Sequence, residues 1–315
     1  KVSPLTARSS RIVEYHPGAV EEAGDFRDGP IASAKFNEPS GLAVDEKGNL
    51  YVSDRGNQRI RYIDFASGQV KTVAGGGTYG PQAVYVEGDY ADGPAGSARF
   101  NAPEGLAVLK DGSVVVADSL NHAIRLIKDG QVTTIAGIGT EYGSADGVPE
   151  YAQFHHPTDV AVMADGRLLV ADEYGNKIRV LQKYARPDVL PEGGIPVLLN
   201  GEWVPSDVPA QIRFNYTYLP VRAVSEALGY EVSSNDLAGE AILKKGDTVI
   251  TIKNGSKQVT VTSNGVSSTL ELNAEAFITQ NRMFVPVRFF AEQSDLDIQW
   301  DNEERIVVIR SKSFQ

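Results

Sequence analysis

Short runs of apolar residues, separated by turn-forming residues, make up most of residues 24–182. Gly, Asp and Asn stand between the runs and favour tight turns. Apolar runs of this length between such residues predict β-strands. In the best-defined segment the pattern predicts four strands, at Leu106–Val108, Val114–Ala117, His122–Ile127 and Gln131–Ile135.

This strand pattern occurs three times. "GDFRDGPIASAKFNEPSGLAV" begins at Gly24, "GDYADGPAGSARFNAPEGLAV" at Gly88, and the more divergent "GSADGVPEYAQFHHPTDVAV" at Gly143. Each is followed by a second block: "GNLYVSDRGNQRIRYI", "GSVVVADSLNHAIRLI" or "GRLLVADEYGNKIRVL". Four antiparallel strands repeated in this way are typical of β-propeller blades. We therefore predict a mainly β first domain, residues 1–186, with blades at about 37–76, 101–137 and 155–182.

An Asp, an Asn and an Arg recur in the second block of every copy. Asp and Asn are favoured in the turn between the second and third strands, because their side chains hydrogen-bond to nearby backbone N–H groups. We expect the Arg to bridge to the Asp or to the next blade. A set that recurs in each copy is better explained by blade construction than by one active site. The set is Asp54, Asn57, Arg61, Asp118, Asn121, Arg125, Asp172, Asn176 and Arg179.

The third copy departs from the other two. It has His155–His156 where they have an Asn and one further residue, and Thr158–Asp159 at the position of their Gly. We also align it with one extra residue before Asn176, which matches His122 to Gln58 and Lys177. No catalytic role therefore repeats with His122.

The pattern Asn-x-Pro-x-Gly-Leu-Ala-Val, followed by Val-x-Asp-x-x-Asn-x-x-Ile-Arg, resembles the NHL repeat of β-propellers over roughly residues 24–182. The resemblance implies blades of an NHL-type propeller. Some NHL-like propellers host lyase or hydrolase chemistry through metals in the central channel, and this is the enzyme alternative. Such a site needs inward-facing His or carboxylate side chains, and only His155 or His156 could supply the His here.

A second domain, residues 195–315, follows a Pro-rich linker at 187–194. "YLPVRAVSEALGYEV" (218–232) matches "FVPVRFFAEQSDLDI" (284–298), and each predicts a strand followed by a short helix. Pro220 and Pro286 suit the helix starts. Asn254–Gly255 and Asn264–Gly265 predict hairpin turns between them. The pattern indicates a small α+β domain with duplicated strand-helix-strand units.

The second domain resembles the copper amine oxidase N-terminal-like domain, or stalk domain, of cell-surface proteins of Firmicutes. The Leu/Val-Pro-Val-Arg motif and the helix after it carry the resemblance. In amine oxidases this domain is a non-catalytic appendage, so the resemblance implies no copper. It implies export, and we expect a signal peptide that is absent from this chain.

Two sets of residues are weak candidates for metal ligands. His155 and His156 form the only unrepeated His pair, and a turn variant is favoured over zinc. The Asp-Gly loops at Asp28, Asp92 and Asp146 are expected on the same rim as the turn carboxylates Asp54, Asp118 and Asp172. Six carboxylates there could bind calcium or a cationic partner, although a solvated-turn interpretation is favoured. We predict no catalytic residue and no cofactor.

The amino-acid composition excludes several kinds of site and partner. The chain has no cysteine, which excludes disulfides, thiolate catalysis and Cys-ligated metals. Its net charge is -11, and no basic block suits a nucleic acid. No apolar run reaches the length that a membrane span needs, so we expect none.

Three blades are fewer than the typical four to eight of a closed propeller. A run that reads as an orphan fourth strand precedes the first Asp-Gly loop; its residues are Arg11, Ile12, Val13, Glu14 and Tyr15. We predict a homodimer in which two chains form one six-bladed ring, with this strand exchanged into the third blade of the partner. A filament, a single-chain closure and a truncated native chain are the alternatives.

The favoured function is non-enzymatic. We expect an extracellular or cell-surface protein that uses its propeller for oligomerisation and for recognition of an envelope protein or glycan. The alternatives are a metal-dependent lyase or hydrolase and a subunit of an extracellular fibre or surface layer. A fold alone does not name the ligand.

Overall fold

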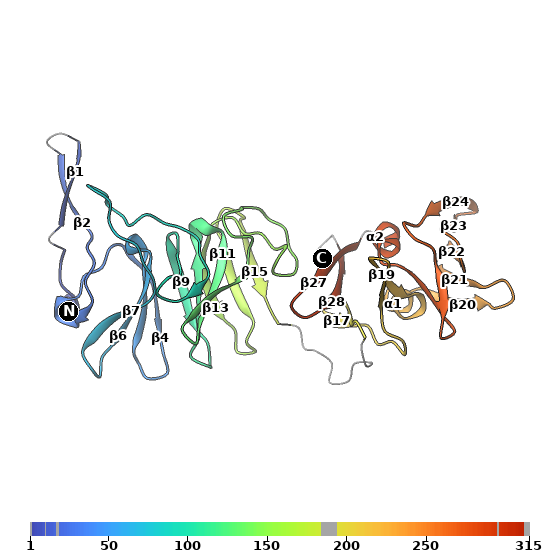
Figure 1. Ribbon diagram of the computed structural model, residues 1–315, viewed down its shortest axis with the longest axis horizontal. Helices are drawn as coiled ribbons and strands as arrows, with labels where there is room; N and C mark the ends of the chain where they lie inside the picture. Colours follow the sequence, from blue (N-terminus) through green and yellow to red (C-terminus); the bar gives the residue numbers. More distant parts are fainter. Residues whose placement is uncertain (1, 10, 17–18, 184–193, 295, 312–315) are drawn as a thin grey trace. The chain divides into compact units, whose positions relative to one another are not determined.

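The computed structural model describes residues 2–9, 11–16, 19–183, 194–294 and 296–311 (Figure 1). The chain divides into two compact units, residues 1–183 and 184–315. Both are mainly β, as predicted, and the second also holds two short helices. Residues 187–193 of the expected linker lie outside the described residues.

The first unit contains three antiparallel sheets that correspond to the three sequence repeats. Blade 1 has the strand order β3-β7-β6-β5-β4 and blade 2 the order β8-β12-β11-β10-β9. Among the described residues, blade 3 has three strands in the order β13-β14-β15. Blade 1 consists of β3 (Gly29–Pro30), β4 (Pro39–Val44), β5 (Leu50–Asp54), β6 (Arg59–Asp64) and β7 (Gln69–Gly75). Blade 2 consists of β8 (Gly93–Pro94), β9 (Pro103–Val108), β10 (Val114–Asp118), β11 (Ala123–Lys128) and β12 (Gln131–Ala136). Blade 3 consists of β13 (Pro157–Val162), β14 (Leu168–Asp172) and β15 (Lys177–Leu181).

Strand β10 of the central blade is apolar at almost every position, because both of its faces are buried. Successive side chains of a strand point to opposite faces of the sheet. In β10, Val114 and Val116 pack in the core between blades 1 and 2, whereas Val115 and Ala117 pack in the core between blades 2 and 3. A strand buried on both faces needs an uninterrupted apolar run, and the sequence "VVVA" supplies it.

The N-terminal strand is confirmed, but it is not an orphan. β1 (Arg11–His16) pairs antiparallel with β2 (Ala19–Ala23), so that the two strands form a separate hairpin beside blade 1 (Figure 1). The repeat pattern gave no signal for β2, because the other copies have no such hairpin. Exchange of β1 into the third blade of a second chain stays a prediction.

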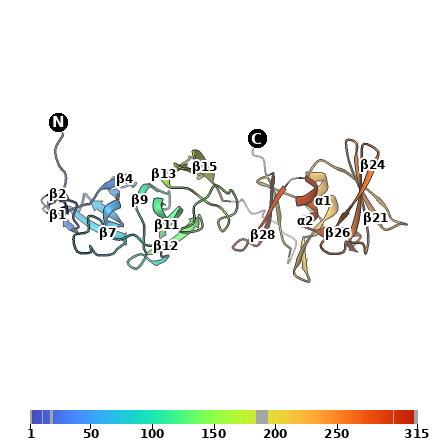
Figure 2. The same ribbon diagram turned by 90° about the horizontal axis from the view of Figure 1, so that it is seen from above.

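The second unit confirms the small α+β domain with its duplication (Figure 2). Leu219 of β19 pairs with Val285 of β26, and the neighbouring pairs are Tyr218 with Pro286 and Pro220 with Phe284. The two copies of the sequence motif therefore pair with each other around a local two-fold axis. α1 (Val221–Ala227) follows β19 (Tyr216–Pro220), and α2 (Arg288–Ser294) follows β26 (Arg282–Pro286).

The strands of this unit, including the two motif strands, form three sheets around one core. The first, in the order β17-β16-β28-β27, holds β16 (Val197–Leu199), β17 (Glu202–Trp203), β27 (Leu296–Asp301) and β28 (Ile306–Ser311). The second adds β18 (Gln211–Arg213) and β25 (Phe277–Thr279) to β19 and β26. The third is a meander of β20 (Glu231–Asn235), β21 (Glu240–Lys245), β22 (Thr248–Lys253), β23 (Gln258–Ser263) and β24 (Val266–Glu271). Val224, Phe289 and Phe290 of the helices pack with these sheets in one core. Among the described residues, no helix has the length and apolar character that crossing a membrane requires.

Candidate functional site

The recurring Asp and Arg residues form a buried ion cluster in each blade. In blade 2, Arg125 donates from Nη1 to Asp118 Oδ2 (2.6 Å) and from Nη2 to Asp92 Oδ1 (2.6 Å). The guanidinium lies between the rings of Tyr90 and Phe100, at 4.8 and 5.2 Å from their centroids. Because the Arg125 and Asp118 side chains are fully buried, water does not screen this pair.

The same cluster occurs in the other two blades. Arg61 donates to Asp54 Oδ2 (2.5 Å) and to Asp28 Oδ1 (2.7 Å). Arg179 donates to Asp172 Oδ2 (3.1 Å) and also pairs with Asp146. Each of the six carboxylates on which a calcium site could depend is thus bound by the arginine of its own blade. The solvated-turn interpretation fits the loop carboxylates Asp28, Asp92 and Asp146 in part, since these side chains are 34–40% exposed. It is wrong for Asp54, Asp118 and Asp172, which are buried.

Each turn Asp also bonds beyond its own turn. Asp118 Oδ1 accepts the Asn101 N–H (2.8 Å), and its Oδ2 accepts Asn121 Nδ2 (2.9 Å). Asn101 lies in the segment that leads into the first strand of the blade. The carboxylate therefore joins this segment, the turn and the third strand, which is a structural role.

The sequence alignment of the third repeat was wrong by one residue. Asn176 has a φ of 53°, which matches Gln58 (54°) and His122 (53°) rather than Asn57 and Asn121. Gly175 takes the position of those two asparagines: a Cβ there would lie 2.5 Å from Asp172 Oδ2. Blade 3 consequently lacks the amide that donates to the turn carboxylate in the other blades. No extra residue is present, and Lys177 does not match His122.

Burial changes the titration of the central carboxyl. It raises the pKa of Asp118 to about 6, from 3.8, although Arg125, Asn121 and the Asn101 N–H oppose the rise. Between these two pH values the folded state keeps a proton that the unfolded chain has lost. The contribution of this group to stability is therefore fully present below about pH 3.8 and is lost as the pH rises through about 6.

We accordingly expect Asp118→Asn to flatten the pH dependence of stability. Between about pH 4 and about pH 7, the free energy of unfolding should fall less in the variant than in the wild type. Urea denaturation at several pH values measures this difference. Asp165→Asn is the control with the opposite sign, because Arg167 lowers the pKa of the exposed Asp165. Equal slopes in the wild type and Asp118→Asn would contradict the assignment.

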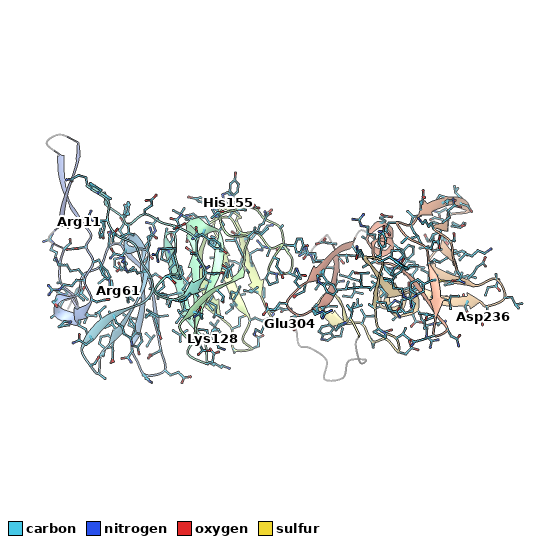
Figure 3. The ribbon with its side chains drawn as sticks, in the orientation of Figure 1. Arg11, Arg61, Lys128, His155, Asp236 and Glu304 are labelled. Carbon is cyan, nitrogen blue, oxygen red and sulfur yellow. The ribbon has the colours of Figure 1, made fainter. Side chains whose placement is uncertain are left out.

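Aromatic rings gather on one rim of blades 2 and 3. Tyr142 stacks on His155, with ring centroids 4.7 Å apart and planes at 24°. Tyr174 stacks on His156, at 4.7 Å and 20°. The two stacks meet where His155 contacts Tyr174 at 84°. The Tyr142 and Tyr174 side chains are 66% and 56% exposed, so this group of four rings, the rim ring cluster, faces solvent (Figure 3 labels His155).

Polar contacts hold the rim ring cluster in place. His156 Nδ1 lies 2.9 Å from Glu173 Oε2, and the His156 N–H donates to His122 Nδ1 (3.1 Å). The His155 N–H donates to Asp172 Oδ1 (2.6 Å). Burial lowers the pKa of His122, and the neighbouring imidazoles of His155 and His156 lower it further. Sequence reasoning noticed the His pair but missed Tyr142 and Tyr174, which come from separate loops.

The metal candidates do not converge. Among the described residues, no three His, Asp or Glu side chains are placed to hold a metal ion. The innermost strands of the three blades line a hollow of about 380 Å³. Its lining residues are Ser40, Gly41, Leu42, Glu104, Gly105, Leu106, Thr158 and Asp159. Neither His155 nor His156 belongs to this lining, so the expected histidine of a channel site lies elsewhere.

The expected oligomerisation strand is described only in part. The Arg11 guanidinium lies 3.7 Å from the centroid of the Tyr79 ring and donates to the Gly24 and Val84 carbonyls. These contacts attach the start of β1 to the segments that precede and follow blade 1 in the same chain. The side chains of Ile12, Val13, Glu14 and Tyr15 lie outside the described residues.

Comparison with known families identifies both units. Residues 36–61, 100–125 and 154–181 match the NHL repeat, and residues 198–309 match the copper amine oxidase N-terminal domain. The chain thus combines three NHL repeats of a β-propeller with a copper amine oxidase N-terminal domain, and both resemblances are confirmed.

Individual relatives match about half of this chain. The chain is 31% identical over 152 residues to protein SUPPRESSOR OF QUENCHING 1, chloroplastic, of Arabidopsis thaliana, which covers 47% of this chain and 14% of that protein. It is 31% identical over 155 residues to human NHL repeat-containing protein 2, or 47% of this chain and 21% of that protein. It thus spans about a seventh to a fifth of these relatives. A crystal structure of a Bacteroides thetaiotaomicron protein of unknown function has 24% identity and a TM-score of 0.41, over 51% of this chain and 39% of that one.

Proposed function

We propose that this chain is a non-enzymatic binding protein of the cell envelope, and that its propeller recognises a glycan. One observation carries the proposal: the rim ring cluster presents two stacked ring pairs to solvent. Export is inferred from the resemblance of the second unit to stalk domains of cell-surface proteins.

The geometry of the rim ring cluster suits a sugar ring. One face of each Tyr ring rests on a histidine and more than half of each tyrosine is exposed, so a ligand can reach both rings. The apolar C–H face of a pyranose packs on such a ring, because its weakly positive hydrogens meet the negative ring face. Since the two stacks meet almost at a right angle, they form a corner rather than a flat patch.

Polar groups at the corner can bind sugar hydroxyls. The Tyr hydroxyls donate and accept, and the half-exposed Glu173 carboxylate accepts next to His156. Tyrosine also loses little conformational entropy on binding, which favours it in recognition surfaces. A few polar groups around an apolar platform are typical of a binding site.

The test is binding to insoluble peptidoglycan in a sedimentation assay, with cellulose as a second glycan. We expect Tyr142→Ala/Tyr174→Ala to weaken binding by about 5- to 150-fold, since each of the two aromatic stacks contributes roughly 0.5–1.5 kcal/mol. Tyr151→Ala removes an equally exposed tyrosine outside the rim ring cluster and should leave binding unchanged.

Three results would overturn the proposal. If the wild type binds neither glycan, a glycan is not the ligand. If the double variant binds as well as the wild type, the rim ring cluster is not the binding site. Release of soluble fragments from the glycan would favour the enzyme alternative. Circular dichroism of each variant verifies that the fold is retained.

A further inference from the structure

The two end faces of the three-blade array expose apolar residues that the repeat otherwise buries. On blade 1, Leu42 of β4 is 65% exposed, whereas its counterparts Leu106 and Val160 are 5% and 4% exposed. We name this surface, with Leu42 and Val44, the leading face. On blade 3, Ile178 of β15 is 69% exposed. We name that surface, with Ile178 and Val180, the trailing face.

The trailing face can be compared with the matching positions of blades 1 and 2 in the same way. Ile60 and Ile124, the counterparts of Ile178 in blades 1 and 2, are fully buried. Ile60 packs with Leu106 and Val116 of blade 2. Ile124 packs with Val160 and Val170 of blade 3. Each internal interface thus joins the trailing side of one blade to the leading side of the next.

We propose that a second copy of this chain docks its leading face on the trailing face of the first. The two exposed faces are the two halves of an interface that the chain already forms twice. Because each copy has one of each, two copies related by a two-fold axis satisfy both pairs of faces and close a ring of six blades. This inference does not depend on the glycan proposal.

One polar contact of the same kind crosses each internal interface. The residues that could form it are also present on the two end faces. Gln58 Oε1 accepts the Ala102 N–H (2.7 Å) between blades 1 and 2. His122 Nδ1 accepts the His156 N–H (3.1 Å) between blades 2 and 3. In each case both residues have a positive φ.

The unpaired ends carry the matching residues. Asn176 stands at the accepting position of blade 3, with a φ of 53°, and Glu38 at the donating position of blade 1, with a φ of 49°. Asn176 Oδ1 is bonded to Cγ, as His122 Nδ1 is, so the two acceptors have the same reach. We expect Asn176 Oδ1 to accept the N–H of Glu38 of the second copy.

One position makes the new interface differ from the internal ones. Gly41 and Gly105 approach the next blade so closely that a Cβ would lie 2.2 Å from the Glu104 carbonyl oxygen and 2.1 Å from Asp159 Oδ1, respectively. Blade 3 has Asp159 at this position. The contact between two copies is therefore wider at its inner edge, and Asp159→Gly is expected to tighten the association.

Sedimentation equilibrium of the purified chain at micromolar concentrations tests the proposal. The wild type should be a dimer, whereas Ile178→Asp and Leu42→Asp should each be monomeric. Val266→Asp, which alters an exposed valine of the second unit, should remain a dimer. Since all three side chains are exposed in the single chain, their replacement leaves its folding intact, which circular dichroism verifies.

Mixing the two monomeric variants identifies the geometry. An equimolar mixture of Ile178→Asp and Leu42→Asp retains one unaltered pair of faces, so a heterodimer weaker than the wild-type dimer is expected. If the leading face instead contacted a second leading face, or the trailing face a second trailing face, no heterodimer would form. That result would overturn the pairing. A monomeric wild type, a dimer that both variants retain, or polymers of unlimited length would overturn the closed ring.

Discussion

Replacing Arg125 by methionine is expected to lower the free energy of unfolding of the first unit by about 3–5 kcal/mol, the usual cost of breaking a buried ion pair. Arg125 binds two carboxylates, Asp118 and Asp92, and its side chain is fully buried. The substitution leaves Asp118 as a buried charge without a counter-ion. It also removes the contacts of the guanidinium with two aromatic rings and with the Arg99 and Ala91 carbonyls.

The chain provides an internal reference for this measurement. Both of its tryptophans, Trp203 and Trp300, lie in the second unit. Tryptophan fluorescence therefore reports unfolding of that unit, whereas far-UV circular dichroism also includes the first. In urea denaturation, Arg125→Met should shift the circular dichroism transition and leave the fluorescence transition in place.

Two further variants separate charge from packing. Arg167→Met breaks an exposed pair with Asp165 (2.8 Å) and should lower the stability far less than Arg125→Met, because water screens the two charges. Asp118→Asn, added to Arg125→Met, removes the stranded charge and should recover part of the stability. If the double variant is instead less stable than Arg125→Met alone, the guanidinium stabilises the blade by packing and not by charge.

The blades could be predicted from the sequence because their signals are local. Apolar runs set the strands, and Asp-Gly turns set their ends, so β9 to β12 lie within a few residues of their expected bounds. The duplicated motif of the second unit was found in the same way. Its pairing with its own copy across Leu219 and Val285 was not, because strand pairing depends on contacts between distant segments.

The turn of the third repeat shows where local pattern is insufficient. Asn176 was matched to Asn57 by residue type, although its backbone conformation places it with Gln58. An Asn favours a tight turn and also tolerates a positive φ, so the residue type alone does not distinguish the two positions. The equal spacing from Asp to Arg in all three repeats was the signal that could have decided it.

The rim ring cluster could not be predicted for a different reason. Tyr142 and His155 lie near opposite ends of the connection from β12 to β13, and Tyr174 lies in the turn between β14 and β15. Only the fold brings the three rings together. The available signal was the departure of the third repeat from the Asn of the others. It pointed to the histidines, but it gave no information on the tyrosines stacked on them.

Alanine at Gly41 is expected to lower the free energy of unfolding of the first unit by about 1–3 kcal/mol, as overpacking does in other cores. The Cβ would lie 2.2 Å from the Glu104 carbonyl oxygen and 3.2 Å from the Gly105 Cα, both backbone atoms of blade 2. A backbone atom in a paired strand cannot turn aside as a side chain can. The two innermost strands must therefore separate, and the core between blades 1 and 2 loses contacts.

Gly96→Ala is the matched control, since nothing lies within 4 Å of the Cβ that it adds and its φ is not positive. Its stability should be unchanged or higher by up to about 1 kcal/mol, because alanine restricts the unfolded chain more than glycine does. Circular dichroism during urea denaturation measures both variants. Equal stability of Gly41→Ala and Gly96→Ala would show that the strands adjust at no cost. In that case the Gly of the repeat would not be explained by close approach of the blades, and Asp159 would be no obstacle to a second copy.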